Sequence, residues 1–348
     1  MKMDPVRENL KDRTGCLGAL ERFSFEAASL KGNLANEDCN RHLIVYLPKS
    51  YCESPERDYP IVYVLHGMDG TPESWFSLIP TDPSLDRIMD TLVQNGDVEE
   101  MILVAVDGST SLLGSWYLNS PVSGNFFDLL TQETIDIVES KYRVKAGSRA
   151  IFGHSMGGFG ALYAAMYRPD LYQACAALSP AGMMMRQHAY QQHADFFQQE
   201  VDKMTRGEEC EWFVYAYLSI LRAIVPDENN PPSYITQNMD RAMEALERFH
   251  LSAIAEERAP ILKTQPKYAE IGDSVVGDVH SLPIYSEIGT NEGESVGDPI
   301  LESFQMMIAK FEELDLPIKH HVFEGGHIDK VSDQIERGLR FISDEFQK

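Results

Sequence analysis

A serine flanked by glycines follows a short apolar run in the middle of this chain. Residues 150–152 lead into Gly153-His154-Ser155-Met156-Gly157, and small residues in a helical pattern follow at once. A strand, a sharp turn and a helix in this order form a nucleophile elbow, in which the serine hydroxyl stands clear of the sheet. A Cβ atom at either flanking glycine would collide with neighbouring backbone in so sharp a turn. The pattern predicts that Ser155 is a catalytic nucleophile.

A serine hydroxyl is a poor nucleophile at neutral pH, so it needs a histidine base that an acidic side chain orients. In this context the chain order is serine, acid, histidine, and three of the ten histidines follow the last candidate acid. His320 and His321 are neighbours in an expected strand, where consecutive side chains point to opposite faces. His327 follows Gly325-Gly326 in a loop beyond that strand. His327 is therefore the predicted base.

The acid is expected in the loop after the penultimate strand. Glu292, Glu294 and Asp298 all lie in this loop, and their positions alone do not choose among them. Glu287 belongs to the strand itself and is less well placed.

Acyl transfer also needs two backbone N–H groups that stabilise the oxyanion. One is expected from Met156, the residue after the nucleophile. The other is expected from Met68, which follows His66-Gly67 at the end of an apolar run. Both predicted roles use the backbone rather than the methionine side chain.

Strand and helix patterns alternate along the chain, as they do in α/β proteins. Strands are expected at residues 23–27, 42–47, 61–65, 101–106, 150–152, 174–179, 283–289 and 318–323, and helices at residues 84–94, 131–142, 156–167, 300–314 and 331–346. The alternation predicts a mostly parallel, doubly wound sheet of about eight strands with helices on both faces. The first two strands follow one another without a helix and fit an antiparallel edge.

Residues 182–281 interrupt the alternation, because they carry helical rather than strand patterns. Both ends of this stretch return to the same sheet. We therefore expect one α/β core, residues 1–181 and 282–348, with residues 182–281 inserted as a helical cap over the C-terminal edge of the strands. Residues 1–18 are polar and are expected to be poorly ordered. Met183 begins a run of three methionines that lines either a deformable apolar pocket wall or the core.

Composition excludes several classes of partner. The chain has 54 acidic and 30 basic residues and a net charge of −24, whereas nucleic acids and anionic membranes select basic patches. The five cysteines are scattered without metal-ligand spacing, so neither a metal nor another cofactor is expected. No apolar run reaches the roughly 18 residues of a membrane span, and no signal-peptide pattern is visible. We expect a cytoplasmic protein that acts on a small-molecule ester. The mature form of a secreted protein would have the same sequence features. No pattern in the sequence indicates the oligomeric state.

Taken together, these motifs resemble the esterase branch of the α/β-hydrolases, which includes esterase D (S-formylglutathione hydrolase), feruloyl esterases and the antigen 85 mycolyltransferases. The matching segments are Leu65-His66-Gly67-Met68-Asp69-Gly70, Trp75, Asp107-Gly108, Gly153-His154-Ser155-Met156-Gly157-Gly158 and Gly325-Gly326-His327. The resemblance spans residues 40–181 and 283–345. It implies an α/β-hydrolase fold with a catalytic triad, and it implies that Met68 and Met156 form the oxyanion hole.

The resemblance also points to particular acid and pocket residues. The family carries its acid in a Gly-Thr-x-Asp turn, and the matching segment Gly289-Thr290-Asn291-Glu292 points to Glu292, a glutamate in place of aspartate. Residues 115–121 resemble the loop that lines the acyl or leaving-group pocket in these esterases. This implies Trp116, Tyr117 and Ser120 as pocket residues, with ordinary packing under the loop as the alternative for the two aromatic residues.

The sequence predicts a serine carboxylesterase that forms an acyl-enzyme, with small aliphatic acyl esters as the expected substrates. A feruloyl-type esterase and an acyltransferase are alternatives that use the same chemistry. A non-catalytic binding protein of the α/β-hydrolase fold is the alternative from another class. Such proteins typically lack the nucleophile or the base, and this chain has both.

Overall fold

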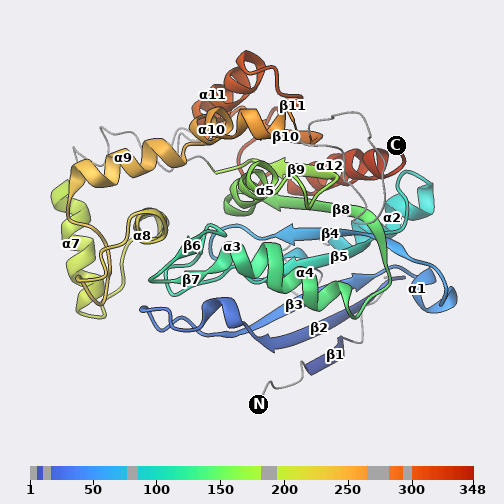
Figure 1. Ribbon diagram of the computed structural model, residues 1–348, viewed down its shortest axis with the longest axis horizontal. Helices are drawn as coiled ribbons and strands as arrows, with labels where there is room; N and C mark the ends of the chain where they lie inside the picture. Colours follow the sequence, from blue (N-terminus) through green and yellow to red (C-terminus); the bar gives the residue numbers. More distant parts are fainter. Residues whose placement is uncertain (1–5, 11–16, 77–84, 182–193, 265–281, 293–299) are drawn as a thin grey trace.

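A nine-stranded sheet forms the centre of the computed structural model, which describes residues 6–10, 17–76, 85–181, 194–264, 282–292 and 300–348 (Figure 1). The strand order is β1-β2-β3-β5-β4-β8-β9-β10-β11. The six strands from β5 to β11 run parallel, and β1, β2 and β3 form an antiparallel edge. The predicted mostly parallel sheet with an antiparallel edge is therefore confirmed.

The strand bounds lie close to those expected from the sequence. The sheet contains β1 (Val6–Leu10), β2 (Ala19–Glu26), β3 (Asn40–Leu47), β4 (Tyr59–Leu65), β5 (Ile102–Val106), β8 (Val144–His154), β9 (Ala174–Leu178), β10 (Ile284–Gly289) and β11 (Ile318–Phe323), and a separate hairpin pairs β6 (Asn119–Ser120) with β7 (Gly124–Asn125). β1 adds a strand, within the stretch expected to be poorly ordered, to the expected eight. Its polar sequence has no apolar alternation that would predict a strand. Backbone pairing with β2 places it in the sheet.

The helical segments include one departure from expectation. They are α1 (Ser50–Glu53), α2 (Leu85–Asn95), α3 (Phe126–Asp128), α4 (Thr134–Glu139), α5 (Met156–Tyr167), α7 (Ala194–Thr205), α8 (Trp212–Ile224), α9 (Met239–Phe249), α10 (Leu251–Leu262), α11 (Ile300–Glu313) and α12 (Val331–Phe346), with 3-10 turns η1 (Ala28–Leu30) and η2 (Pro72–Trp75) and a π-helical turn η3 (Leu129–Glu133). The helix expected over residues 131–142 begins within the π turn η3 and ends at Glu139, three residues earlier than expected. Such π turns occur as single-turn insertions within α-helices.

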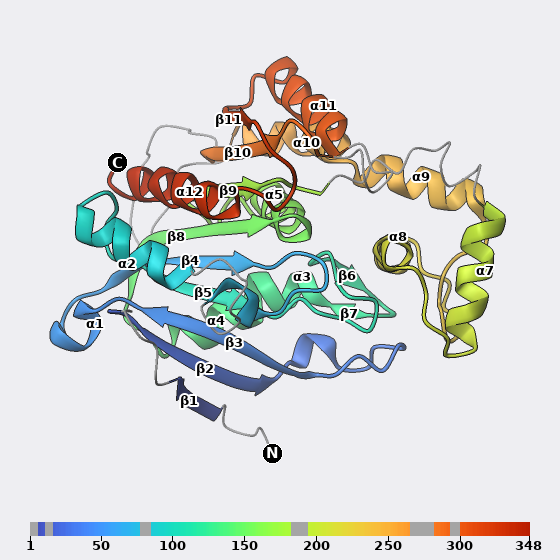
Figure 2. The same cartoon turned by 180° about the vertical axis from the view of Figure 1, so that it is seen from behind.

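The strands β4, β5, β9 and β10 are buried on both faces, which explains their mostly apolar sequences, whereas the edge strand β11 is largely exposed. Ile61, Tyr63 and Leu65 of β4 pack into the core that contains α5. Val62 and Val64 alternate with them and pack into the core that contains α2 and α12. Figure 1 shows α3, α4 and α5 on one face, and Figure 2 shows α2 and α12 on the other. Each fully buried side chain of this size contributes about 1.5–3 kcal/mol.

The described part of the predicted insertion, residues 194–264, is helical apart from turns and a single bridge between Pro226 and Ile235. α7, α8 and α9 lie beyond one end of the sheet, and α8 contacts β6 of the β6–β7 hairpin (Figure 1). α10 instead packs against α5 and α11 and extends the helical layer of the core. The division into a core and a cap at residues 182 and 281 stays a prediction. Within the described residues, no helix is both long enough and apolar enough to span a bilayer.

Buried polar contacts fix α8 to the core. The Arg222 guanidinium lies 3.2 Å from a carboxylate oxygen of Glu37, and both side chains are buried. The Arg222 carbonyl accepts a hydrogen bond of 2.9 Å from the Ser120 hydroxyl. Ser219 Oγ accepts another from the indole N–H of Trp116, at 2.9 Å. Because these groups are removed from water, their pairing strongly favours one position of α8.

Candidate active site

Ser155 forms the sharp turn between β8 and α5. Its backbone lies at φ 59° and ψ −121°, a conformation that costs a residue with a side chain about 1–3 kcal/mol. Three backbone hydrogen bonds of 3.0 Å hold this turn: Ser155 N–H donates to Leu178, and its carbonyl accepts from Phe159 and Ala181. The turn is therefore built into the packing of β8, β9 and α5.

The two glycines of the motif leave the space that this turn needs. A Cβ on Gly153 would lie 2.1 Å from the carbonyl oxygen of Gly157, and a Cβ on Gly157 would lie 2.0 Å from that of Leu65. Real Cβ atoms do not approach other atoms so closely, so a larger residue would have to displace the backbone of α5 at Gly153 or of β4 at Gly157. The expected need for glycine at both positions is confirmed.

A continuous hydrogen-bonded chain joins Ser155, His327 and Glu292. His327 Nε2 lies 2.8 Å from Ser155 Oγ, and His327 Nδ1 lies 2.7 Å from Glu292 Oε2. A carboxylate can only accept, so Nδ1 carries the proton and Nε2 accepts the serine hydroxyl proton. This is the arrangement that a histidine base needs in order to deprotonate a serine.

The Glu292 side chain is fully buried and is compensated by hydrogen bonds. Besides His327, its carboxylate accepts from the Ser179 hydroxyl at 2.6 Å and from the Gly289 N–H at 2.8 Å. Ser179 Oγ in turn accepts from Gln334 Nε2 at 2.8 Å. Such charge-assisted bonds offset the cost of removing a carboxylate from water.

The structure also locates the other acids that the sequence left open. Glu287 lies within β10 and accepts a hydrogen bond of 2.8 Å from Arg337, so its charge is matched elsewhere. Glu294 and Asp298 lie outside the described residues. His320 and His321 lie within β11, as expected.

The two predicted oxyanion donors lie close to Ser155. Met156 is the first residue of α5, so its N–H has no acceptor within the helix. A Cβ on Gly67 would lie 3.2 Å from the Ser155 Cβ, which brings the peptide between Gly67 and Met68 next to the nucleophile. A Cβ on Gly114 would lie 2.6 Å from Met68 Sδ and 2.3 Å from Met156 Sδ, so the two methionine side chains meet at this glycine.

His66 shapes the turn that carries Met68. Its Nδ1 lies 2.8 Å from the Gly67 carbonyl, and its Nε2 accepts a hydrogen bond of 2.9 Å from the Gly108 N–H. The Tyr117 hydroxyl donates to the His66 carbonyl at 3.2 Å. Burial lowers the pKa of His66, so a neutral imidazole joins the loops that follow β4 and β5.

Three of the four predicted pocket residues are described. Trp116 and Tyr117 are 2% and 1% exposed, and Ser120 is also buried. Their polar atoms bond to α8 and to the turn at His66. The structure thus places these side chains in the packing beneath the loop. Met183 lies outside the described residues.

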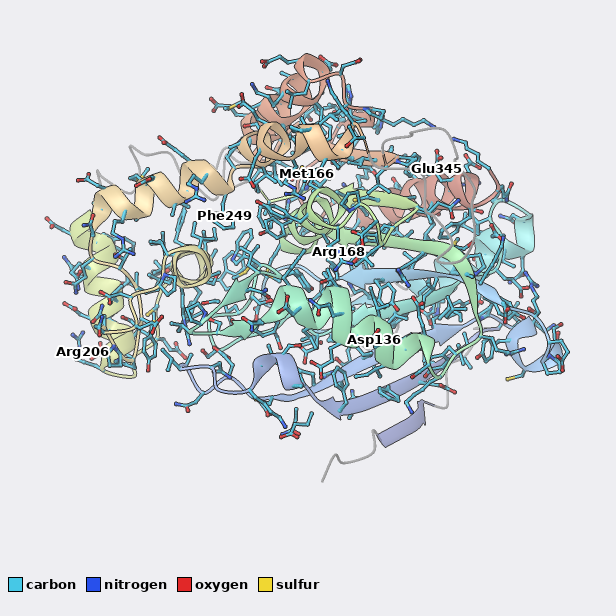
Figure 3. All side chains as sticks on the ribbon, in the orientation of Figure 1. Asp136, Met166, Arg168, Arg206, Phe249 and Glu345 are labelled. Carbon is cyan, nitrogen blue, oxygen red and sulfur yellow. The ribbon has the colours of Figure 1, made fainter. Side chains whose placement is uncertain are left out.

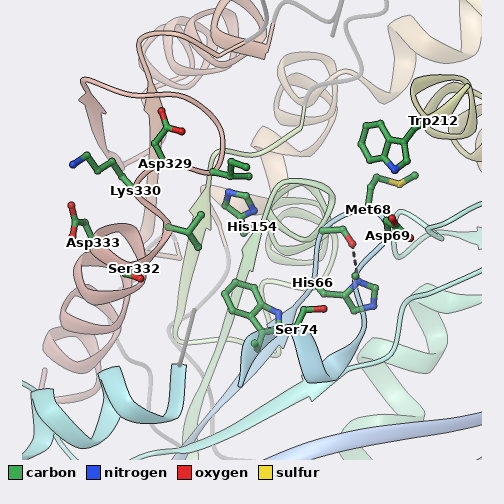
Figure 4. A pocket seen from close by; sticks show the side chains of 15 residues that line it. His66, Met68, Asp69, Ser74, His154, Trp212, Asp329, Lys330, Ser332 and Asp333 are labelled. Carbon is green, nitrogen blue, oxygen red and sulfur yellow. Dashed lines mark hydrogen bonds between the residues drawn. The ribbon is translucent and has the colours of Figure 1, made fainter. Parts of the chain in front are cut away.

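A cavity of about 720 Å³ is lined by His154 and Ile328, the sequence neighbours of Ser155 and His327 (Figure 4). Its walls come from the loop after β4, from η2, from the first residue of α8 and from the turn that leads into α12. The lining residues are His66, Gly67, Met68, Asp69, Gly70, Ser74, Trp75, His154, Trp212, Ile328, Asp329, Lys330, Val331, Ser332 and Asp333. Trp212 is 48% exposed and Ile328 is 75% exposed, so an apolar ligand group could contact both.

Sequence reasoning missed three residues of this site. The Ser179 hydroxyl donates to the buried carboxylate of Glu292, Gln334 donates to Ser179 Oγ behind it, and His154 contacts the loop of His327. The position of Ser179 directly after a buried strand could have indicated a residue of the site. Gln334 had no signal of its own in the sequence. Among the described residues, no group of three or more histidines, cysteines and carboxylates is placed to hold a metal ion.

Comparisons with known proteins identify relatives among esterases. The sequence model of the family described as "Putative esterase" matches residues 35–211. An "Endo-1,4-beta-xylanase/feruloyl esterase" from Xylanibacter ruminicola is 28% identical over 133 residues, which cover 37% of this chain and 18% of that protein. The chain spans less than two thirds of the length of the curated relatives that it matches.

Two solved structures share the fold over nearly the whole chain. A ferulic acid esterase has a TM-score of 0.62 at 20% identity and covers 94% of this chain and 99% of its own. An S-formylglutathione hydrolase from Agrobacterium tumefaciens has a TM-score of 0.61 at 14% identity and covers 97% and 99%. The α/β-hydrolase fold expected from the sequence is confirmed.

The close packing at Gly157 leads to a stability prediction. Gly157→Ala should strongly destabilise the protein, because the new methyl group must displace the Leu65 carbonyl at the end of β4. Gly96→Ala is the control, since this glycine has φ +74° and no neighbour within 4 Å. The free energy of unfolding of this variant should fall by only about 1–2 kcal/mol, the cost of holding alanine in a left-handed backbone conformation. Equal midpoints of chemical unfolding for the two variants would contradict this account of the elbow.

Proposed function

The chain belongs to this esterase family of the α/β-hydrolase fold, and from that premise we propose that it is a serine carboxylesterase with Ser155, His327 and Glu292 as its triad. The observation that carries the proposal is the chain of two hydrogen bonds, 2.8 and 2.7 Å long, from Ser155 Oγ through His327 to a buried carboxylate. Serine hydrolases of unrelated folds share this constellation.

Acylation begins with attack of Ser155 Oγ on the ester carbonyl carbon. His327 Nε2 takes the hydroxyl proton as the new C–O bond forms, and the carbonyl oxygen becomes an oxyanion. The N–H groups of Met68 and Met156 stabilise that charge. Collapse of the tetrahedral intermediate breaks the bond to the alcohol oxygen, which takes the proton from His327 and leaves as a neutral alcohol.

Deacylation repeats these steps with water. His327 removes a proton from the attacking water, and the second tetrahedral intermediate collapses to release the carboxylic acid and restore the Ser155 hydroxyl. Glu292 keeps the Nδ1 tautomer and stabilises the imidazolium that forms in both halves. These steps require no metal ion or organic cofactor.

The charges on the cavity wall support an uncharged substrate. Asp69, Asp329 and Asp333 line the cavity, against one ammonium group, that of Lys330. The two histidines on the wall do not offset this excess, because burial lowers the pKa of both and brings that of His154 to about 3. An anionic group such as those of glutathione would therefore be repelled, whereas hydroxyl groups could donate hydrogen bonds to the carboxylates.

Small aliphatic acyl esters of neutral alcohols are the proposed minimal substrates. Esters that contain a ring, including feruloyl esters, are the second candidate, because the exposed indole of Trp212 offers a flat surface at the cavity. The cavity volume of about 720 Å³ is in the range that holds such a molecule.

Substitutions of the triad test the mechanism. Ser155→Ala should lower kcat on 4-nitrophenyl acetate by roughly 10⁴-fold or more, and Glu292→Gln by about 10³- to 10⁴-fold through the wrong histidine tautomer. Circular dichroism should show both variants folded. Substantial turnover by folded Ser155→Ala would refute the proposal.

The cavity charges predict discrimination between matched esters. The kcat/KM for neutral methyl 4-acetoxybenzoate should exceed that for the 4-acetoxybenzoate anion by about 10-fold at low ionic strength, equivalent to about 1.4 kcal/mol. Added salt should narrow the gap, because it screens exposed charges.

Asp333→Asn should also reduce the difference in kcat/KM between the neutral and the anionic ester. Asp136→Asn is the matched control, because each aspartate lies in the first turn of a helix and Asp136 lies away from the cavity on α4 (Figure 3). Equal rates on the two esters, or equal effects of the two substitutions, would show that the cavity charges do not select the substrate.

A further inference from the structure

The side chain of His154 connects the strand of the nucleophile to the loop of the base. His154 is the last residue of β8 and directly precedes Ser155. Its Nε2 lies 2.9 Å from the main-chain carbonyl oxygen of His327. The two imidazole rings also pack together, with centroids 4.8 Å apart.

The loop that carries His327 has little stiffness of its own. Gly325 has φ +156°, and Gly326 follows it, so two adjacent residues lack a Cβ that would restrict the backbone. Gly325 accepts a hydrogen bond of 2.9 Å from the Asn291 N–H, and Gly326 donates one of 2.7 Å to Asp329. These contacts hold the residues before His327, so the position of His327 itself depends on contacts made at that residue.

Two side chains from separate parts of the fold contact His327 from opposite ends of the residue. Glu292 binds the imidazole at Nδ1, and His154 binds the main-chain carbonyl. The first contact orients the ring, and the second fixes the backbone from which the ring extends. Both are needed because a ring that pivots about Glu292 would move Nε2 away from Ser155 Oγ.

The protonation state of His154 allows it to bind the His327 main chain without taking part in proton transfer. A carbonyl oxygen only accepts, so His154 Nε2 must carry a hydrogen. Burial, together with the nearby His327, lowers the pKa of His154 to about 3. His154 is therefore neutral at the pH values at which a histidine base works, and it does not place a second positive charge beside the imidazolium of His327.

We propose that His154 is a positioning residue, whose Nε2–H···O bond to the His327 main chain keeps the base within reach of the Ser155 hydroxyl. The inference rests on the proposed esterase function. Loss of the bond lets the glycine loop move, and a displacement of about 1 Å at the reacting groups can lower the rate by about 100-fold.

Three substitutions at His154 separate hydrogen bonding from packing. His154→Gln places an amide N–H near the position of Nε2, His154→Asn carries the same amide one carbon shorter, and His154→Leu fills the space without a donor. We expect kcat on 4-nitrophenyl acetate to stay within about 3-fold of wild type for Gln and to fall by about 10- to 100-fold for Asn and Leu. His154 also lines the cavity, so KM is measured for every variant, and the test of the hydrogen bond is the difference in kcat between Gln and the other two.

The NMR signal of the His327 Nδ1 proton provides a readout that does not require turnover. This proton bonds to the Glu292 carboxylate, and its downfield resonance should persist in wild type and His154→Gln and broaden or vanish in His154→Leu. Thermal unfolding identifies any variant that fails to fold. If His154→Leu does not fold, kcat and the resonance are compared between His154→Gln and His154→Asn.

Each outcome bears on one proposal. Folded His154→Leu with wild-type kcat and an unchanged resonance, or His154→Gln as impaired as His154→Leu, would overturn the role of His154. If wild type hydrolyses no ester, the proposed function fails, and the resonance alone still decides whether His154 orders His327.

Discussion

The turn at Ser155 exists because three segments of backbone approach one another closely enough to exclude any side chain between them. The ends of β4 and β8 and the start of α5 meet at Gly153 and Gly157, and hydrogen bonds from β9 and α5 hold the serine at φ 59°. Packing on both faces of the sheet supplies the stability that offsets the cost of this conformation, about 1–3 kcal/mol. The serine hydroxyl is thus presented by a closely packed, hydrogen-bonded turn.

The remaining parts of the site are arranged around this fixed hydroxyl. The base comes from a glycine-rich loop, so its position depends on contacts with Glu292 and His154 rather than on the loop itself. The buried carboxylate of Glu292 is matched by three hydrogen-bond donors. The buried imidazoles of His66 and His154 have lowered pKa values. In the proposed mechanism, charge therefore develops at His327 and at the oxyanion and not on these two imidazoles.

Features with local causes could be predicted from the sequence. α12 (Val331–Phe346) has the expected bounds, because Ile335, Leu339 and Ile342 recur at helical spacing within one segment. β11 (Ile318–Phe323) also has the expected bounds. The resemblance pointed to Glu292, but the residues alone left two competitors. Contacts between distant segments were not predictable: His154 meets His327 across 173 residues, and Gln334 meets Ser179 across 155. No local pattern records which strand ends lie side by side in the folded sheet.

If Ser155 is the nucleophile, it carries the acyl group during turnover. Rapid quenching of the wild-type protein during turnover of 4-nitrophenyl butyrate, followed by intact-mass and peptide mass spectrometry, measures this directly. One butyryl group per chain is expected, located on the peptide that contains Ser155. A butyryl group on another residue, or turnover under conditions in which acylated Ser155 would accumulate but none is found, would contradict it.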